Sequence, residues 1–313
     1  MGGPSVAMRI GVDLGGTKIE AVVMDERSRL VVRERVVTPQ DDYRATLETI
    51  AVLVRRLEAA IGRQDLPVGV GHPGAISPST GLLKNSNSTC LNGRPFQQDL
   101  EAVLGHEVYL ANDADCLAVS EARDGAATGA ANVFAVILGT GVGGGIAIGG
   151  RLLRGPNAIA GEWGHNPLPW IRPEWNELPG AECWCGRHGC IEIWLSGVGL
   201  ARDHERVTAE RLSGEGVVQR AEAGEERAAA TLSRYADRLA RALAHVINLL
   251  DPDVIVLGGG VSRVERLYRT VPALWNRWVF SDRVDTKLLP ALHGDSSGVR
   301  GAAFLCSESQ PRC

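Results

Sequence analysis

Short apolar segments near the start of the chain are each followed by turn-forming residues. Residues 8–14 are alternating and β-branched and predict a strand, Gly15-Gly16-Thr17-Lys18 predicts a turn, and residues 19–24 predict a return strand. Residues 30–37 extend this hairpin, and residues 67–71 predict a short buried strand. The pattern therefore predicts a β-sheet in the first part of the chain.

Helical periodicity follows and alternates with further strands. A helix is predicted to begin near Asp41 and to end at Gly62, and a longer one covers 225–250. Residues 108–112 predict a strand that runs directly into a helix from 113 to about 123. This arrangement puts the polar residues of the 112–113 pair at the carboxyl end of a strand.

The opening pattern recurs about 125 positions later. Residues 133–138 predict a strand, a glycine turn is predicted through Gly145, and residues 146–148 predict the return strand. A further apolar strand over 254–257 runs into a third glycine sequence. We therefore expect two similar α/β domains with mixed sheets. Their predicted extents are 8–121, completed by the C-terminal segment 296–313, and 122–295.

Composition narrows the class of protein. The 313 residues include 33 Lys or Arg and 37 Asp or Glu, which gives a net charge of −4 and a pI of about 6.0. A cationic nucleic-acid or membrane-surface binder is therefore not expected. No apolar stretch reaches the roughly 18 to 20 residues that span a bilayer, and the N-terminus does not resemble a secretory signal. A cytoplasmic location is predicted.

Three glycine turns follow apolar strands, at residues 13–18, 139–145 and 258–260. Glycines let backbone N–H groups converge on an anion, and the hydroxyls of Thr17 and Thr140 can add donors, so phosphate binding is predicted. The alternative is that each turn only needs glycine for a positive φ. The 139–144 segment matches a dinucleotide fingerprint, but a strand rather than a helix follows it. A Walker A loop is excluded because the chain has no Gly-Lys dipeptide.

Two acidic residues lie at strand ends beside these turns. Asp13 is adjacent to the first turn and can hold Mg²⁺ directly or through water. Asp113, in the first turn of a helix, is expected to be kept ionised by the helix dipole and can accept a proton from a substrate hydroxyl. An ordinary helix cap is the alternative for Asp113.

Three of the seven cysteines lie within eight residues. Together with His165 they supply one nitrogen and three sulfur ligands, which is a closed tetrahedral set typical of structural Zn²⁺. His188 is a competing ligand, and free thiols are the alternative to a metal. The predicted zinc ligands are His165, Cys183, Cys185 and Cys190.

As a set, these motifs resemble the ROK family of bacterial sugar kinases and repressors. The resemblance rests on Asp13-x-Gly-Gly-Thr-Lys18, Leu138-Gly-Thr-Gly-Val-Gly-Gly-Gly145, Glu162-x-Gly-His165 and the Cys-x-Cys-Gly-x-x-Gly-Cys sequence of 183–190. Within the family, the chain is most similar to the bacterial fructokinase (mannofructokinase) branch. That similarity lies in the segments 38–43, 84–89, 162–170 and 293–300.

The resemblance implies an actin-like ATPase (ribonuclease H-like) fold, with two related α/β domains and a nucleotide cleft between them. It implies Asp113 as the catalytic base and Asn112, Glu162, His165 and Glu192 as ligands of the sugar hydroxyls. His165 would then use one ring nitrogen for zinc and the other for the sugar. The implied ATP-binding residues are Gly11, Asp13, Gly15, Gly16, Thr17, Lys18, Gly139, Thr140, Gly141, Gly143, Gly144, Gly258 and Gly259.

The function implied by the resemblance is phosphorylation of a hexose at its 6-hydroxyl by ATP and Mg²⁺ in a homodimer. D-fructose is the expected sugar, and N-acetylglucosamine kinase or glucokinase activity is the alternative. Trp163 would crowd a 2-acetamido group if it packs toward the sugar, or else it anchors its loop. A non-catalytic sugar-responsive regulator is a different class of alternative, although a repressor would need a DNA-binding segment, and only seven residues precede Met8. His72 is given no role.

Overall fold

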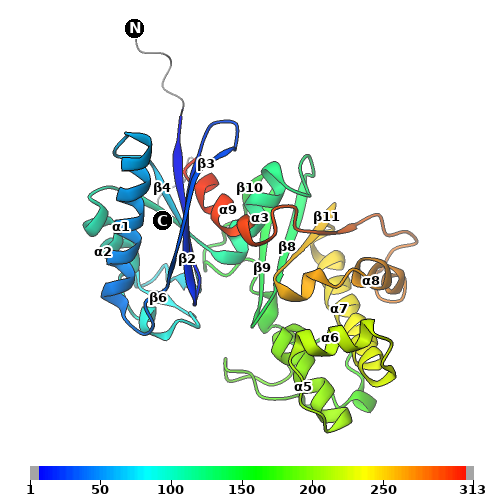
Figure 1. Cartoon of the computed structure of the whole chain (residues 1–313). Helices are drawn as coiled ribbons and strands as arrows, with labels where there is room; N and C mark the ends of the chain where they lie inside the picture. The colour runs from blue at the N-terminus through cyan, green and yellow to red at the C-terminus, as the bar shows by residue number, and fades with distance from the viewer. Residues whose placement is uncertain (1–6, 308–313) are drawn as a thin grey trace.

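The computed structural model describes residues 7–307 and contains two five-stranded mixed sheets, which lie in the two halves of the molecule in Figure 1. In the first sheet the order is β3-β2-β1-β4-β7. Strands β1, β4 and β7 are parallel, and the predicted hairpin and meander form the antiparallel edge. Its strands are β1 (Arg9–Leu14), β2 (Lys18–Met24), β3 (Leu30–Val37), β4 (Val68–His72) and β7 (Val108–Asn112).

The second sheet repeats this topology, in the order β10-β9-β8-β11-β12. Strands β8, β11 and β12 are parallel, and β9 and β10 form the antiparallel edge. Its strands are β8 (Asn132–Leu138), β9 (Val142–Ile148), β10 (Arg151–Leu152), β11 (Val254–Gly258) and β12 (Lys287–Pro290). The prediction of two similar α/β halves is therefore confirmed. A small hairpin of β5 (Ala75–Ile76) and β6 (Leu83–Lys84) projects from the first half.

The second glycine turn is shorter than the sequence predicts. Strand β9 begins at Val142 rather than 146, so residues 143–145 pair with β8 instead of forming the turn. These glycines allow close packing: a Cβ on Gly144 would lie 2.6 Å from the Trp163 ring, and one on Gly145 would lie 2.4 Å from the Ala114 carbonyl oxygen. A glycine-rich sequence after a strand predicted a turn, whereas here it makes room for neighbouring elements.

Two helices cover the outer face of the first sheet. Helix α1 (Tyr43–Ile61) begins where the Asp42 side chain accepts a hydrogen bond from the Ala45 amide, and it ends at Gly62 in the left-handed conformation. Helix α2 (Phe96–Leu104) follows the single turn η1 (Thr89–Leu91). Apolar faces of both helices pack with the strands in one buried core.

The second half has more helical cover, centred on a 25-residue helix, α7 (Glu226–Leu250). This helix confirms the predicted 225–250 segment, and its C-terminal residues precede β11. The other elements are η2 (Trp163–His165), η3 (Pro173–Trp175), α4 (Ile191–Leu195), α5 (Gly197–Thr208), α6 (Gly214–Glu222), η4 (Gly260–Arg263), α8 (Leu267–Trp275) and η5 (Gly294–Ser296). Within residues 7–307, every helix is too short or too polar to cross a bilayer.

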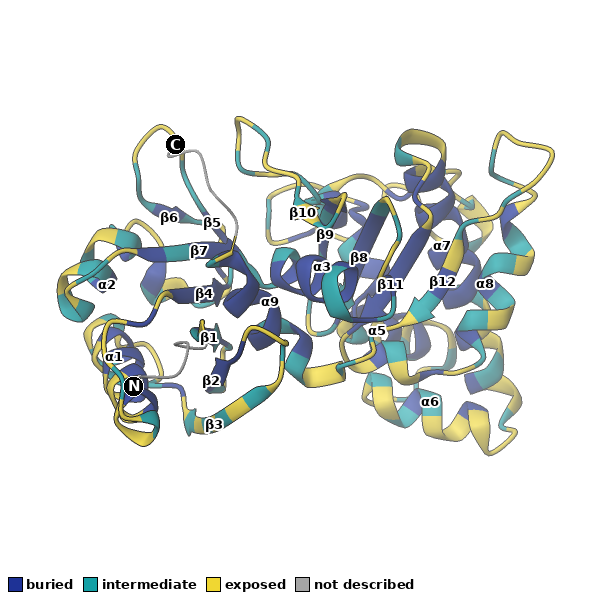
Figure 2. Cartoon of the chain, turned by 90° about the horizontal axis from the view of Figure 1, so that it is seen from above, coloured by how far each residue is buried: buried dark blue, intermediate teal, exposed yellow. Residues whose placement is uncertain are grey.

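Helices α3 (Asp113–Asp124) and α9 (Ser297–Leu305) pack together between the two sheets (Figures 1 and 2). The approach is close, because a Cβ on Gly301 would lie 1.8 Å from the Cys116 carbonyl oxygen. The predicted boundary between 121 and 122 falls inside α3, and residues 308–313 of the predicted completing segment lie outside the described residues. The division into domains stays a prediction.

Candidate active site

The carboxyl ends of the parallel strands in the first sheet bring three predicted site residues to one edge. Asp13 of β1 lies opposite Gly71 of β4, and His72 of β4 lies opposite Asn112 of β7. Asp113 follows Asn112 directly as the first residue of α3. This edge of an α/β sheet is where ligands usually bind.

Hydrogen bonds fix the orientation of Asn112 and Asp113. The Asn112 side-chain oxygen accepts from the Ala114 amide at 2.9 Å, and its Nδ2 donates to the Gly74 carbonyl oxygen at 3.0 Å. Asp113 Oδ1 accepts from the same Ala114 amide at 2.8 Å. Asn112 is therefore the N-cap of α3, and Asp113 lies inside the first turn with its carboxylate held in place.

Burial dominates the electrostatics of these acids. Burial raises the pKa of Asp113 to about 6, with a smaller contribution from the charge of Glu162. Burial and then the charge of Asp113 raise the pKa of Asp13 to about 7. The expectation that the helix dipole keeps Asp113 ionised is therefore too simple, because desolvation outweighs the favourable hydrogen bond from the Ala114 amide. Asp115, which sequence reasoning left out, also lies in this turn, and burial raises its pKa to about 8.

The first glycine turn is held by residues that the sequence analysis did not assign. The Gly15 amide donates to the Lys18 carbonyl oxygen at 3.0 Å. The hydroxyl of Thr38 donates to the Gly15 carbonyl oxygen at 2.7 Å, and Gln40 Nε2 donates to the Gly16 carbonyl oxygen at 2.8 Å. These hydrogen bonds to the backbone carbonyl groups fix the shape of the turn. Both residues lie in the 38–43 segment, which had carried only the family resemblance.

The second and third glycine turns lie beside each other, because β8 and β11 are adjacent parallel strands. In the second turn the Gly139 amide donates to the Gly141 carbonyl oxygen at 3.0 Å. In the third, Gly259 has a φ of 83°, and a Cβ there would lie 2.5 Å from the Leu138 carbonyl oxygen. Within these two turns, Gly259 most clearly requires glycine, because it combines a positive φ with a close backbone contact.

Not every predicted ATP-binding glycine lies in a turn. Gly11 is in the middle of β1, where a Cβ would lie 2.1 Å from the Val299 carbonyl oxygen of α9. Gly143 is in β9, and a Cβ there would lie 3.1 Å from the Ala114 side chain. Packing accounts for glycine at Gly11, Gly143 and Gly144, and contact of these three with ATP stays a prediction.

The predicted sugar-binding residues of the second half share one electrostatic environment. Burial raises the pKa of Glu162, His165 opposes this shift, the charge of Glu192 adds to it, and the half-buried Lys84 of β6 opposes it. Because Glu162 also acts on Asp113, these groups gather around the start of α3. Lys84 is a further charged group here to which sequence reasoning gave no role.

The carboxylate of Glu192 on α4 accepts two hydrogen bonds from the protein. Its Oε2 accepts from the Val142 amide at 3.0 Å, and its Oε1 accepts from Trp184 Nε1 at 2.6 Å. The Trp184 ring also meets the His165 ring edge to face, with centroids 5.0 Å apart. Trp184 therefore joins the sugar-binding candidates to the cysteine segment, a contact that no sequence pattern indicated.

The four predicted zinc ligands come together in space. One ligand atom from each of His165, Cys183, Cys185 and Cys190 lies within 4.8 Å of all the others. Cys185 Sγ and Cys190 Sγ are 3.7 Å apart, and His165 Nδ1 is 3.7 Å from Cys183 Sγ. A tetrahedral zinc with Zn–S bonds of about 2.3 Å needs sulfurs about 3.8 Å apart. The donor set therefore fits zinc, whereas the exposed His188 lies outside this group.

The structure shows the surroundings of Trp163 and His72, whose roles the sequence leaves open. Trp163 is 5% exposed, its Nε1 donates to the Gly143 carbonyl oxygen at 3.1 Å, and its ring packs on Phe134. It is thus a buried anchor of its loop. His72 is buried against Phe96, and burial lowers its pKa to about 4, so it is a neutral packing residue.

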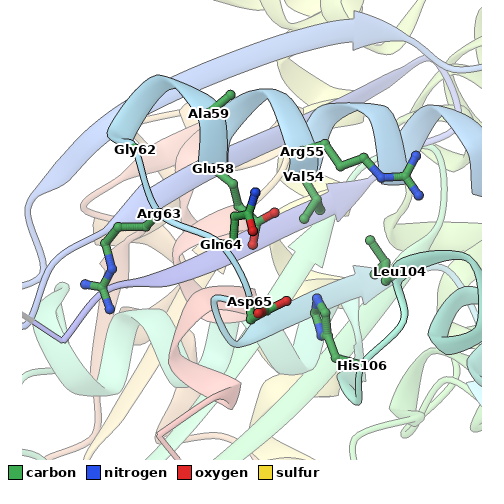
Figure 3. Close-up of a pocket in the computed structure, with 10 residues that line it drawn as sticks. All are labelled: Val54, Arg55, Glu58, Ala59, Gly62, Arg63, Gln64, Asp65, Leu104 and His106. Carbon is green, nitrogen blue, oxygen red and sulfur yellow. The ribbon is translucent and has the colours of Figure 1, made fainter.

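A cavity of about 830 Å³ lies elsewhere, at the C-terminal ends of α1 and α2 (Figure 3). It borders the 62–65 loop that leads into the amino end of β4, whereas Asp13 and Asp113 lie at the carboxyl ends of the strands. Its lining includes Arg55, Glu58, Asp65 and His106 and none of the predicted site residues. The cavity is therefore separate from the candidate active site.

Comparisons with known proteins find relatives of similar sequence and fold. N-acetyl-D-glucosamine kinases of Photobacterium profundum and Vibrio cholerae are each 39% identical over 301 residues, covering 95% of this chain and 99% of theirs. A ROK hexokinase structure from Thermus thermophilus superimposes with a TM-score of 0.83 at 30% identity, covering 95% of this chain and 97% of that one.

A second solved structure carries ligands. It is a ROK family glucokinase from Streptomyces griseus in complex with glucose and AMPPNP, with a TM-score of 0.77, 30% identity, and coverage of 95% of this chain and 98% of that one. The fold is accordingly that of the actin-like ATPases. The ROK family model matches residues 9–309. By its sequence and its fold, this chain belongs to the ROK family.

Proposed function

We propose that this chain transfers the γ-phosphoryl group of ATP to the 6-hydroxyl of a hexose. The observation that carries the proposal is the position of Asp113, a half-buried carboxylate beside the glycine turns and the Glu162, His165 and Glu192 group. Burial puts the pKa of Asp113 at about 6, close to the working range of a general base at neutral pH.

In this proposal the chain positions two substrates. Amides of the glycine turns hold the ATP phosphates, and Asn112, Glu162, His165 and Glu192 bind sugar hydroxyls. Asp113 takes the 6-hydroxyl proton on its carboxylate, whose Oδ1 is already oriented by the Ala114 amide. Phosphoryl transfer passes through a loose transition state, so positioning and charge neutralisation carry most of the catalysis.

Two metal ions fit residues of the chain. Asp13 would hold Mg²⁺, a cation that favours carboxylate oxygens and neutralises phosphate charge when bound. Its mutual repulsion with Asp113 is the kind of strain that such a cation relieves. The cysteine cluster with His165 would hold a structural Zn²⁺. His165 Nδ1 is the ring nitrogen facing Cys183, which leaves Nε2 for the sugar.

N-acetylglucosamine is the first sugar that we propose, because relatives 37% to 39% identical over nearly the whole chain are named N-acetyl-D-glucosamine kinases. The sequence argument against a 2-acetamido group fails, since Trp163 packs into the core of the second half. D-fructose is the second candidate, on the resemblance of the 38–43, 84–89, 162–170 and 293–300 segments to the fructokinase branch. A homodimer is also expected from the family resemblance.

Comparing kcat/KM for N-acetylglucosamine, fructose, glucose and mannose tests this choice, because specificity is the ratio of these constants. We expect at least about tenfold preference for N-acetylglucosamine, equivalent to about 1.4 kcal/mol in transition-state binding. A comparable preference for fructose would establish the second candidate instead. Absence of turnover with all four sugars would contradict the hexose kinase proposal itself.

A further inference from the structure

The segment between the two groups of predicted zinc ligands has little regular structure. Between His165 and Cys183 it contains only the single turn η3, and the isolated bridges Pro167–Cys190 and Glu182–His188 are its strand-like pairings. Backbone hydrogen bonds therefore attach only a small part of this segment to neighbouring helices or strands. Something else must hold it against the second half of the protein.

Buried ion pairs to helix α7 do this. Glu177 of the segment accepts from Arg238 Nε at 2.8 Å and from Arg241 Nη2 at 2.8 Å, and the side chains of all three are at most 1% exposed. A second ion pair has the arginine on the segment and the carboxylate on α7. Arg172 of the segment donates to both carboxylate oxygens of Asp237, at 3.2 and 2.9 Å. We call these five residues the Glu177 clamp.

The arginines of the clamp also contact the backbone and an aromatic ring of the segment. Arg241 Nη1 donates to the carbonyl oxygens of Pro169 and Trp170, both at 2.9 Å. The Trp175 ring of η3 lies 4.6 Å from the Arg172 guanidinium and 5.7 Å from that of Arg238. Arg238 Nε and both terminal nitrogens of Arg241 therefore donate to the segment, whereas the terminal nitrogens of Arg238 donate to Asp203 of α5.

The same face of α7 holds α4, which carries Glu192. Arg238 lies over the Trp194 ring at 4.6 Å, and the Tyr235 hydroxyl donates to the Leu195 carbonyl oxygen at 2.7 Å. One helix thus fixes both the segment that joins His165 to the cysteines and the helix of a second predicted sugar ligand.

Stability alone does not explain such a cluster. Desolvation makes a buried ion pair about as stabilising as apolar residues of the same volume, or less so, and its best-attested use is to fix one geometry. Glu177 stays ionised here: burial opposes ionisation, but hydrogen bonds from Arg241 and Arg238 hold its pKa below the ordinary value.

We propose that the Glu177 clamp positions the segment between His165 and Cys183, and with it the zinc and hexose ligands at its two ends, with Glu177 and Arg241 as positioning residues. The hexose part rests on the proposed function, and the zinc part does not. No clamp residue belongs to the glycine turns, so the clamp should leave ATP binding unaffected.

The test compares Glu177→Gln with a matched control, Glu58→Gln. Glu58 is also a buried carboxylate, it accepts a hydrogen bond from the Leu66 amide, and it lies on α1 in the other half. Zinc-loaded proteins are mixed with a chromogenic chelator to measure the rate of zinc loss, and KM is measured for hexose and for ATP. Arg241→Lys, which keeps the charge, is the second variant and decides by the same criteria if Glu177→Gln does not fold.

We expect the clamp variants to lose zinc at least about fivefold faster and to raise the hexose KM by a similar factor, with the ATP KM within about twofold. The control should lower the melting temperature without either effect. If the clamp variants lower only the melting temperature, as the control does, the proposal is overturned. Absence of hexose-dependent turnover in the wild type would contradict the proposed function, while the rate of zinc loss still decides whether the clamp positions the segment.

Discussion

The two sides of the candidate site hold their polar groups by different means. Asp13 and Asp113 are placed by regular structure, at the ends of parallel strands and at the start of a helix. His165 and the cysteines lie on an irregular segment, where a ligand cluster and buried ion pairs take the place of backbone ladders.

The difference also extends to electrostatics. The strand-end acids are crowded and desolvated, so their pKa values rise to about 7 and about 6. Glu177 of the irregular segment is 2% exposed, more deeply buried than the half-buried Asp13 and Asp113, but its arginine partners hold its pKa below the ordinary value. The first region places its carboxylates close to one another, whereas the second pairs its carboxylates with arginines. In the proposed function, the strand ends carry the reacting groups, and the ion-paired segment holds its ligands in place.

The largest effect is expected from Asp113→Asn. The amide is nearly isosteric but cannot accept the proton, and loss of a general base typically costs ~10² to 10⁴ in rate. We expect the fold and ATP binding to persist, measured by circular dichroism and calorimetric titration, with kcat reduced by that factor. A variant with more than about a tenth of the wild-type kcat would show that Asp113 is not the base.

On the other side, Cys185→Ser should remove the metal. Wild-type protein purified without added zinc is expected to hold about one zinc per chain by elemental analysis, and the variant well under half of that. Its melting temperature should fall by roughly 5 to 10 °C. Cys90→Ser is the matched control, since Cys90 lies outside the cluster. A full zinc complement in Cys185→Ser would rule out the predicted ligand set.

Asp13→Asn tests whether the strand-end acids are strained. The folded pKa of Asp13 lies above the unfolded value, so stability from this group is present at low pH and is lost as pH rises through about 7. Without Mg²⁺ or nucleotide, the variant should be more stable than wild type by on the order of 2 to 4 kcal/mol at pH 8, with the gain shrinking toward pH 4. Urea unfolding at pH 5 and pH 8 measures this. A variant less stable than wild type at both pH values would refute the account of strain.

The pH dependence of the rate should follow Asp113. Because the base must be ionised and its pKa is about 6, kcat/KM for the hexose should rise about tenfold per pH unit below 6 and level off above 7. Initial rates between pH 5 and pH 8 give this profile. A flat profile over that range would mean that burial does not tune the catalytic base.

The smallest effect is expected from Trp163→Phe. The change removes the hydrogen bond to the Gly143 carbonyl oxygen and should cost about 1 kcal/mol in unfolding free energy. Because the ring is buried, the ratio of kcat/KM for N-acetylglucosamine to that for fructose should change by less than about twofold. A larger change in this ratio would place Trp163 at the sugar rather than in the core.

Regular structure explains why one side of the site was predictable. A strand that runs into a helix at Asn112 and Asp113 can be read from apolar runs and helix starts, because local backbone geometry fixes those residues. The doubled strand-turn-strand pattern likewise predicted the central strands of both sheets, but it missed the edge strands β10 and β12 and the start of β9, where glycines serve packing rather than a turn.

Long-range contacts explain the rest. The ligand set of His165 and the cysteines was predictable from chemistry and spacing, but the partner of Glu177 was not, since Arg238 and Arg241 lie more than 60 positions away. Thr38, Gln40, Lys84 and Trp184 were missed for the same reason, because no periodicity marks a side chain that reaches another element.

The most direct test of the central claim is to identify the product. The wild-type protein is incubated with ATP, Mg²⁺ and each of the four hexoses, and ³¹P NMR follows the phosphorus signals. We predict a phosphomonoester at the sugar 6-position that accumulates in equal amount with ADP, and negligible ADP without sugar. ADP formation that does not depend on sugar, or that yields only inorganic phosphate, would contradict the account.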